Sequence, residues 1–309
     1  HVHEAHALGA HGHEAHEQLE AAELDDLGDH KGVDVAVEHA PNAPLAPHTV
    51  FDPQDMRNGR TPGQRAVLLR RLARVICNSE YLRRRLLDGV TAPPRLAPAV
   101  LPNPVDLAGL PPPRPRENLI LFAGRIVREK APDSFVAACA IALPQLPGWR
   151  AEMIGADRFR ADSPDTDFAR VTRAAAEQAG VHMLGYRDHD AVLQAIAAAA
   201  IVVMPSRWQE PFGLVALEAL ASGAALICSD RGGLPEVAGD AAVYANPDDP
   251  AAFAAAIRAL ASDPGRRAAY EQAGRERARQ FAAPVVAGRL ATLRQEVLAQ
   301  ARTDAAAGS

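Results

Sequence analysis

The sequence contains few cysteines, few aromatic residues and almost no lysine. Its three cysteines, Cys77, Cys139 and Cys228, are widely spaced over 309 residues in apolar or strand-like contexts. This spacing argues against a disulfide framework and predicts reduced structural thiols, as is usual in the cytoplasm. Of the 33 basic residues only Lys31 and Lys130 are lysine. The lysine at position 130 reflects either chance or a need for a compact ammonium group there.

Long apolar runs and a strong excess of charge are also missing. No stretch approaches the roughly eighteen consecutive apolar residues of a membrane-spanning helix, so we expect no integral membrane protein. The amino end is polar and histidine-rich instead of basic and then apolar, so we expect no signal peptide. The net charge of -5 and the pI of about 6.1 argue against a nucleic-acid partner. We therefore expect a soluble, cytoplasmic protein.

Residues 1–40 form an acidic, histidine-rich tract. They contain ten acidic residues against Lys31, and their apolar residues are mostly alanine, which buries little surface. We expect residues 1–30 to be a loosely ordered leader with one helix near 14–24. A metal-binding histidine tract is the less favoured alternative, because no periodic set of ligands is fixed on one helix face.

Residues 31–113 predict a partial amino-terminal α/β region followed by a linker. A short strand is expected at 33–37, after which prolines interrupt regular structure. From Thr61 the pattern becomes helical. Ser79 is then placed to cap a second helix. The apolar positions are Leu68, Leu72, Val75 and Ile76 in the first helix and Leu82 and Leu86 in the second.

Residues 114–282 alternate short apolar strands with helices. The strands lack polar alternation, which is typical of a parallel sheet buried on both faces. Right-handed crossovers then give a doubly wound, Rossmann-like α/β domain with ligands at the carboxyl ends of its strands. Two or three further helices are expected between 250 and about 300, with 283–309 as a carboxyl-terminal helix and tail. Strands are expected at 119–123, 150–154, 181–184, 201–204, 225–228 and 242–244, and helices at 133–143, 167–179, 190–199 and 213–222.

The first group of residues with chemical potential follows the strand at 119–123. Gly124 permits close approach of the backbone, and Arg125 offers a planar fork of donors suited to phosphate oxygens. Lys130 is expected to open the next helix and to reach the same anion as a point charge. The alternative is a solvated basic loop, and the residues alone favour neither. A P-loop is excluded, because no Gly-Lys-Ser/Thr sequence is present.

The second group lies around the helix at 213–222. Gly213 begins that helix and leaves its first backbone N–H groups open, which makes an anion site. Glu218 is the only charge in the helix, and a buried carboxylate is costly unless a partner such as a hydroxyl-rich ligand is present. The alternative is that Glu218 faces solvent. Glu210 precedes the helix, so the two acids do not share a helix face and would hold different parts of one ligand. Gly232-Gly233 permits a tight turn near the same crevice, although ordinary loop chemistry would also explain the pair.

Several short motifs occur along the chain. They are Gly124-Arg125, Glu129-Lys130, Glu210-Pro211-Phe212-Gly213 with Glu218, Gly223, and Gly232-Gly233-Leu234-Pro235-Glu236, with Asn78-Ser79-Glu80 and Asn103-Pro104-Val105-Asp106 as looser matches. Together they resemble glycosyltransferase family 4 over roughly residues 100–300. The resemblance implies a GT-B fold, in which two Rossmann-like domains face each other across a cleft and the carboxyl-terminal domain holds the nucleotide sugar. It also implies transfer with retention, no cofactor and no catalytic metal.

By position, the resemblance also implies roles for individual residues. Arg125 and Lys130 would bind the donor diphosphate and, together with Glu210, form the catalytic set. Glu210 would contact the sugar, and Glu218 the ribose hydroxyls. The family's amino-terminal domain is longer and carries a cleft histidine, for which His48 is a loose positional match. The implied donor-binding set is Gly124, Arg125, Lys130, Glu210, Phe212, Gly213, Leu214 and Glu218.

The function hypothesis follows from these implied roles. We expect a retaining glycosyltransferase that moves a sugar from a nucleotide-diphosphate donor to a hydroxyl acceptor, either saccharide or lipid-linked. Surface polysaccharide, lipopolysaccharide or glycolipid synthesis is the expected setting. The alternative, favoured by the short amino-terminal region, is a non-catalytic sugar-nucleotide-binding fragment or subunit.

Two further signals concern metals and membranes. Asp165-Thr166-Asp167 and Asp188-His189-Asp190 match the acidic pairs of metal-dependent glycosyltransferases, but both stand where helices begin, which favours capping. Between Arg57 and Arg95 ten arginines stand against Glu80 and Asp88. Such basic amphipathic helices predict reversible attachment to an anionic inner membrane face, with a solvated surface as the equal alternative.

Overall fold

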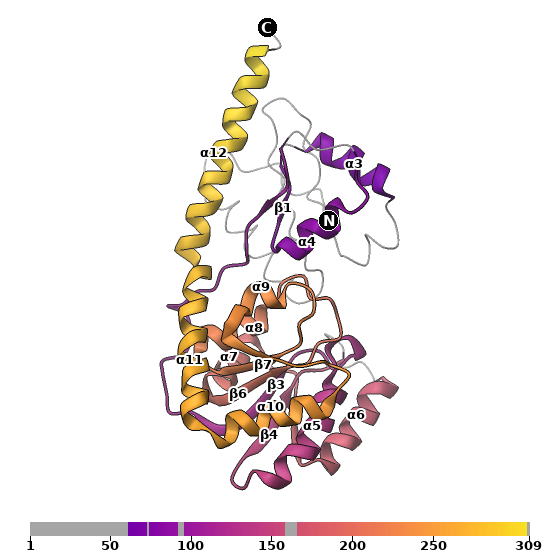
Figure 1. Ribbon diagram of the computed structural model, residues 1–309, viewed down its shortest axis with the longest axis vertical. Helices are drawn as coiled ribbons and strands as arrows, with labels where there is room; N and C mark the ends of the chain where they lie inside the picture. The colour runs from indigo at the N-terminus through magenta and orange to yellow at the C-terminus, as the bar shows by residue number, and fades with distance from the viewer. Residues whose placement is uncertain (1–60, 73, 92–95, 158–165, 308–309) are drawn as a thin grey trace, which may run out of the picture.

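The computed structural model describes residues 61–72, 74–91, 96–157 and 166–307 of the chain. Within these residues the chain forms a six-stranded sheet covered by helices and a smaller amino-terminal region with a two-stranded sheet (Figure 1). The predicted leader at 1–30, the strand at 33–37 and His48 lie outside the described residues.

The six-stranded sheet is parallel throughout, with the strand order β5-β4-β3-β6-β7-β8. The order reverses direction at β3, where β4 lies on one side and β6 on the other, so the domain is doubly wound as predicted. Each of the six strands predicted between residues 114 and 282 is present, and three have the predicted bounds. The strands are β3 (Glu117–Ala123), β4 (Arg150–Ile154), β5 (Val181–Gly185), β6 (Ala199–Met204), β7 (Ala225–Cys228) and β8 (Ala242–Tyr244).

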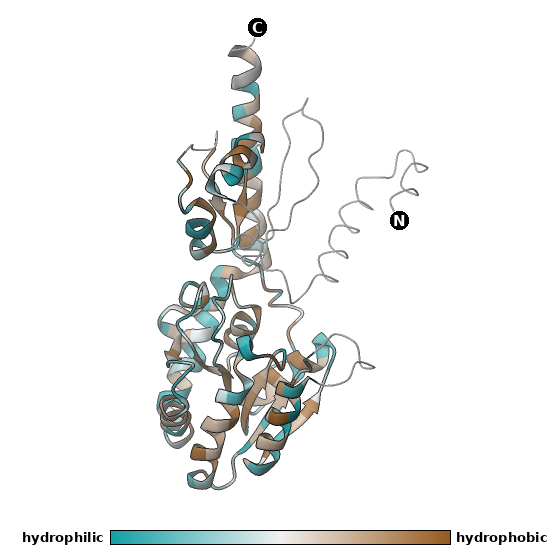
Figure 2. Cartoon of the chain, turned by 90° about the vertical axis from the view of Figure 1, so that its right-hand side faces the viewer, coloured by the Kyte–Doolittle hydropathy of each residue, from teal (hydrophilic) through white to brown (hydrophobic). Residues whose placement is uncertain are grey.

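Alternate residues of the central strands face two separate cores. Ile120 and Phe122 of β3 pack with residues of α5, α6 and α10, whereas Leu119 and Leu121 pack with residues of α7, α8 and α9. Because both faces are covered, no strand position needs a polar residue. Figure 2 shows the hydrophobic colour concentrated in the sheet. The helices are α5 (Pro132–Ala142), α6 (Asp167–Gln178), α7 (His189–Ala198), α8 (Leu214–Ser222), α9 (Leu234–Ala238), α10 (Pro250–Ser262), α11 (Pro264–Ala278) and α12 (Ala283–Ala307).

Two local differences from the sequence predictions affect the site. Lys130 does not open the next helix: it ends the 3-10 turn η1 (Arg128–Lys130), and α5 begins at Pro132. Proline favours the first helical position, and Ala131 before it has a φ of 53°, which separates the two elements. The short helix α9 was not predicted, because five residues beginning Leu-Pro show no periodic pattern.

The amino-terminal region has a small core of its own. It contains α3 (Pro62–Arg71), β1 (Ile76–Cys77), α4 (Glu80–Leu87) and β2 (Ala99–Val100), with β1 and β2 parallel. The predicted cap is confirmed, because the Ser79 side chain accepts a hydrogen bond from the backbone N–H of Leu82 at 3.1 Å. The predicted helical stripe is wrong beyond Leu72, since Ile76 lies in β1. The core residues are Leu69, Leu72, Val75, Cys77, Leu82 and Leu86.

Backbone hydrogen bonds and an ion pair connect the amino-terminal region to the rest of the described chain. The Glu236 carboxylate, at α9, accepts hydrogen bonds from the backbone N–H groups of Glu80 at 2.5 Å and Tyr81 at 2.6 Å. These donors are at the positive amino end of α4, where an anion is favourable. The long helix α12 runs from the large domain past the amino-terminal region, and Arg74 forms an ion pair with its Glu296 (Figure 1).

The basic stretch around α3 and α4 is less available than its composition suggests. Arg65 is buried and donates to the backbone carbonyls of Leu86 and Asp88. Arg74 pairs with Glu296, and Arg83 pairs with Glu80 at 2.7 Å. In the part of the chain that is described, no helix is both long and apolar enough to cross a membrane.

The three cysteines are free and buried, as the predicted structural thiols should be. Burial raises the pKa of the Cys77 thiol to about 12. The pKa values of the Cys139 and Cys228 thiols are also raised by burial. Each thiol therefore stays protonated at neutral pH and acts as a small apolar side chain.

Candidate functional site

The site lies at the carboxyl edge of the sheet, where the loops after β3, β6 and β7 meet. Crevices at this edge beside the strand-order reversal are the usual ligand sites of doubly wound domains. The first predicted group follows β3, the second follows β6, and the Gly232-Gly233 pair follows β7. The fold therefore brings together three segments that are separated by up to about a hundred residues of sequence.

A buried ion pair joins the first two groups. The Lys130 ammonium lies 2.9 Å from Oε1 and 3.0 Å from Oε2 of Glu210. The Glu210 side chain is 5% exposed and that of Lys130 is 20% exposed. The hydroxyl of Ser206 also donates to Glu210 Oε1, at 2.6 Å. A lysine and a glutamate that sequence analysis placed in separate motifs thus neutralise each other at the centre of the site.

The loop carrying Glu210 is fixed to the loop carrying Lys130 through the backbone of Glu129. Its carbonyl accepts hydrogen bonds from the N–H groups of Arg207 at 2.8 Å and Trp208 at 2.9 Å. The guanidinium of Arg207 adds a two-pronged contact with Asp133, and this hydrogen bonding raises the pKa of Arg207. The position of Glu210 relative to Lys130 is therefore set by backbone geometry as well as by charge.

The glycine pair after β7 packs against the Glu210 loop. The N–H of Gly233 donates to the carbonyl of Glu210 at 2.6 Å, and that of Gly232 donates to Gln209 Oε1 at 2.9 Å. Gly232 has a φ of 64°, and a Cβ at this residue would lie 2.1 Å from the Glu210 carbonyl oxygen. The predicted tight turn is confirmed, and only glycine fits it.

The amino end of α8 lies next along the chain from Glu210. Gly213 caps the helix with a φ of 105° and no side-chain hydrogen bond, which leaves the first N–H groups for another acceptor. A Cβ on Gly213 would lie 2.5 Å from Leu234 Cδ2, so the close packing of α9 also requires glycine here. Phe212 is buried edge-on against Phe281, and Leu214 is 40% exposed. Phe212 therefore serves the core with its side chain, and only its backbone remains for a ligand.

Glu218 does not face open solvent. Its side chain is 15% exposed, and Oε1 lies 2.7 Å from Nε2 of His189. His189 is the first residue of α7 and is 69% exposed. The protein itself thus supplies one polar partner for the carboxylate, and no hydrogen bond from a described residue occupies the second carboxylate oxygen.

Gly124 and Arg125 follow β3 at the same edge. The N–H of Gly124 donates to the carbonyl of Ile154 at 3.0 Å, which continues the β3–β4 ladder into the loop. A Cβ on the neighbouring Gly155 would lie 1.8 Å from the Gly124 carbonyl oxygen. Gly155 therefore permits the two loops to approach, and Arg125 is left half-buried beyond them.

Sequence reasoning missed Ser206, His189 and Gly155. Gly155 directly follows a predicted strand and Ser206 lies two residues after another, so their place at the carboxyl edge was the available signal. His189 was assigned only to a helix start, which is confirmed, because Asp188 caps α7 by accepting from Ala191 N–H at 2.8 Å. Thr166 caps α6 in the same way. No group of three or more potential metal ligands occurs among the described residues.

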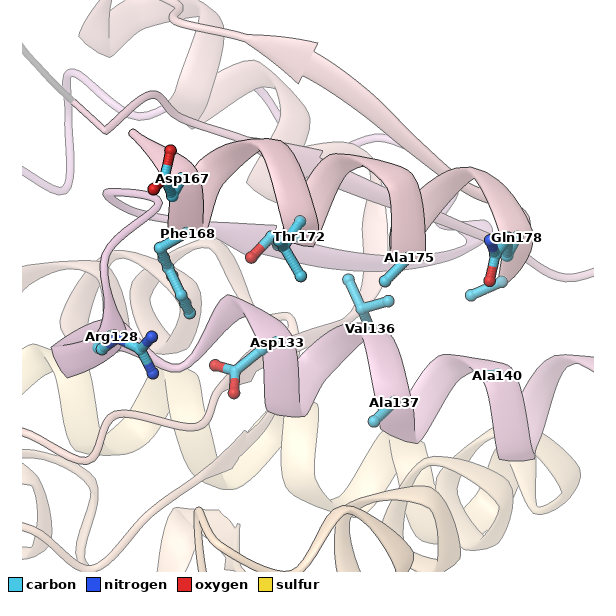
Figure 3. A pocket seen from close by; sticks show the side chains of 12 residues that line it. Arg128, Asp133, Val136, Ala137, Ala140, Asp167, Phe168, Thr172, Ala175 and Gln178 are labelled. Atoms are coloured by element: carbon cyan, nitrogen blue, oxygen red, sulfur yellow. The ribbon is translucent and has the colours of Figure 1, made fainter. Parts of the chain in front are cut away.

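A separate groove of about 530 Å³ runs between α5 and α6. Arg128, Asp133 and Phe168 lie at one end, and Gln178 lies at the other (Figure 3). None of the predicted donor-binding residues lines this groove. The groove is therefore separate from the predicted donor site.

Known proteins resemble the chain over the part that holds this site. The sequence model of the family described as "Glycosyl transferases group 1" matches residues 111–277, which is more than half of the chain. Glycogen synthase of Mycobacterium tuberculosis is 34% identical over 195 residues, covering 58% of this chain and 43% of that protein. The chain thus spans less than half the length of this relative.

Solved structures show the same fold. Sucrose-phosphate synthase from Thermosynechococcus elongatus is 25% identical with a TM-score of 0.65, covering 79% of this chain and 64% of that chain. HepE from Anabaena, solved in complex with UDP and glucose, is 20% identical with a TM-score of 0.66, covering 79% and 67%. The expected likeness to GT-B enzymes is confirmed. With its sequence motifs, its doubly wound domain and the family match in agreement, the chain belongs to the group 1 glycosyltransferases.

Proposed function

We propose that this chain carries the donor half of a retaining glycosyltransferase, which moves a sugar from a nucleotide-diphosphate donor to a hydroxyl acceptor. The single observation that best supports this proposal is the Lys130–Glu210 pair beside the open amino end of α8. An ammonium, a carboxylate and open N–H groups at one edge of the sheet offer hydrogen-bond donors to a diphosphate and an acceptor to sugar hydroxyls.

Each residue has a proposed role. Arg125 and Lys130 bind the diphosphate, helped by the backbone N–H groups of Gly213 and Leu214. Glu210 accepts hydrogen bonds from the sugar, and Glu218, oriented by His189, accepts them from the ribose. Gly124 and Phe212 contribute backbone surface.

The chemistry follows from where charge develops. As the bond between the anomeric carbon and the phosphate oxygen breaks, negative charge grows on the leaving diphosphate. Preorganised cations and N–H groups stabilise that charge without a metal. The acceptor hydroxyl attacks from the leaving group's own face and transfers its proton to the departing phosphate, which accounts for retention.

A donor screen tests the proposal. HepE, which shares the fold, was solved with UDP and glucose, so uridine-, adenosine- and guanosine-diphosphate sugars form the starting panel. We expect one class to raise the Tm of the protein, because a ligand that binds only the folded state stabilises it. If no member of the panel shifts the Tm, the proposal fails.

The second candidate function is a sugar-nucleotide-binding fragment or subunit without transfer activity. Among the described residues, the proposed donor-binding residues all belong to the large domain, as this candidate requires. Donor binding without any turnover, followed by turnover on adding a separate acceptor-domain protein, would favour this candidate.

The acceptor and the place of action are also proposals. We propose a saccharide or lipid-linked acceptor in surface polysaccharide, lipopolysaccharide or glycolipid synthesis. We further propose a cytoplasmic protein that attaches reversibly to an anionic membrane face through the arginines of α4, of which Arg84 is exposed.

A further inference from the structure

Ser206 has no part in the proposed function so far, yet it touches the central carboxylate. It follows β6 after Pro205, and its side chain is 0% exposed. Its Oγ lies 2.6 Å from Glu210 Oε1 and 3.1 Å from the backbone carbonyl of Glu129. A hydroxyl has one proton to donate, and the shorter contact with a carboxylate identifies Glu210 as its main acceptor.

The two groups that contact the Glu210 carboxylate do different things. Lys130 lies almost equally far from both oxygens, at 2.9 and 3.0 Å, so it balances the charge without distinguishing the oxygens. Ser206 contacts Oε1 alone. Among the described residues, Lys130 is the only hydrogen-bond partner of Oε2. The serine therefore determines which oxygen is free when the lysine moves.

Ser206 is itself held independently of Lys130. Its carbonyl accepts a hydrogen bond from the Ser229 hydroxyl at 2.7 Å, at the end of β7. The next two residues, Arg207 and Trp208, donate through their N–H groups to the Glu129 carbonyl. A displacement of the Lys130 side chain leaves all of these contacts in place.

We propose that Ser206 is a positioning residue that holds Glu210 for the sugar once the donor diphosphate has attracted Lys130. The hydroxyl retains Oε1, and Oε2 then accepts a hydrogen bond from a sugar hydroxyl. This inference rests on the proposed function, in which Lys130 binds the diphosphate and Glu210 the sugar.

Removing the Ser206 hydroxyl should affect the binding of two ligands differently. A nucleoside diphosphate has no sugar for Glu210, so Ser206→Ala should change its affinity less than twofold. The matching nucleotide sugar should lose roughly tenfold in affinity, the usual effect of a hydrogen bond to a charged group. Calorimetry of the parent with UDP, ADP and GDP and their glucose esters first identifies the pair of ligands that binds. The variants are then measured with that pair.

Further variants serve as the control and as the rescue. Ser134→Ala is the matched control, because Ser134 is also a buried serine but its hydroxyl has no hydrogen-bond partner among the described residues. It should bind both ligands like the parent. Ser206→Thr keeps a hydroxyl and should restore the affinity for the nucleotide sugar to within about threefold of the parent. If Ser206→Ala does not fold, Ser206→Cys, with its weak donor, serves in the same comparison.

Three outcomes would overturn the inference. Unchanged affinity for the nucleotide sugar in the serine variant would show that the hydroxyl does not act. An equal loss for both ligands would mean that Ser206 only supports the loop. A parent protein that binds no nucleoside diphosphate would instead overturn the proposed function, and this inference with it.

Discussion

At the scale of single residues, the site depends on how one buried carboxylate is neutralised. Glu210 is 5% exposed and takes its counter-charge from Lys130. A buried pair of this kind adds little net stability, because desolvation offsets attraction, but removing one partner leaves an uncompensated charge. Lys130 therefore has a structural role in the unliganded protein in addition to its proposed role toward the diphosphate.

The first prediction concerns this double role. Lys130→Ala should lower the free energy of unfolding by on the order of 1–3 kcal/mol, because the Glu210 carboxylate loses a charged hydrogen-bond partner. Adding Glu210→Gln should recover most of that stability but not the donor affinity. Urea denaturation measures the first effect and calorimetry the second. A single variant as stable as the parent would show that the ion pair does not form in solution.

The second prediction concerns Glu218 and His189. Glu218→Gln keeps the shape of the side chain and removes the charge, so the affinity for a nucleoside diphosphate should fall roughly tenfold through the lost ribose contact. The free energy of unfolding should change by less than about 1 kcal/mol, since the pair with His189 is at the surface. If the variant binds the nucleoside diphosphate like the parent, Glu218 does not contact the ribose.

Single residues were predictable where a motif carried them, and their pairings were not. The resemblance singled out Lys130 and Glu210, but they are 80 positions apart and no local pattern indicates that they form a pair. The same holds for His189 and Glu218, which are 29 positions apart. Contacts of this range depend on sheet order, which a strand pattern leaves open.

At the scale of elements, the site is built by loops that pack on one another through glycine. Gly155 lets the β4 loop reach the β3 loop, and Gly232 lets the β7 loop reach the β6 loop. The strands hold the ends of these loops in register, and the glycines set how closely the loops meet.

The third prediction compares two glycines with similar backbone conformations. Gly180 has a φ of 70°, and a Cβ added there would meet nothing within 4 Å. Gly232 has a φ of 64°, and a Cβ added there would lie 2.1 Å from the Glu210 carbonyl oxygen. Gly180→Ala should cost about 1 kcal/mol through backbone strain alone. Gly232→Ala should cost about 1–3 kcal/mol more, because it must displace the Glu210 loop. Equal losses on chemical denaturation would contradict the close packing.

The elements themselves were largely predictable. Strands such as β6 and β7 are continuous apolar runs between turn residues, and helices such as α8 end at glycine. The prediction failed where one apolar stripe extends over two elements, as from Leu72 to Ile76. There α3 ends and β1 begins, and Arg74 is the one polar residue between them in that stretch.

At the scale of the whole molecule, the small amino-terminal region carries the charge that would meet a membrane. Contacts within the protein already engage Arg65, Arg74 and Arg83. What remains around α4 is a smaller basic surface than the sequence predicts, so any attachment should be weak and sensitive to salt.

The fourth prediction tests that attachment. At low salt the protein should sediment with anionic vesicles and not with neutral ones, and Arg84→Gln with Arg85→Gln should reduce the bound fraction. Arg170→Gln on α6, which is 65% exposed and belongs to the other part of the molecule, is the matched control. Equal sedimentation with both vesicle types, or none with either, would contradict attachment to an anionic membrane.

Titration calorimetry of the parent and Arg125→Ala with nucleotide-diphosphate sugars in excess EDTA tests the proposed donor site itself. We expect the parent to bind one donor class without metal and Arg125→Ala to weaken this affinity roughly tenfold or more, because a charged phosphate contact is lost. Binding that disappears in EDTA and returns with Mn²⁺, or equal affinity in the two proteins, would contradict the proposed donor site.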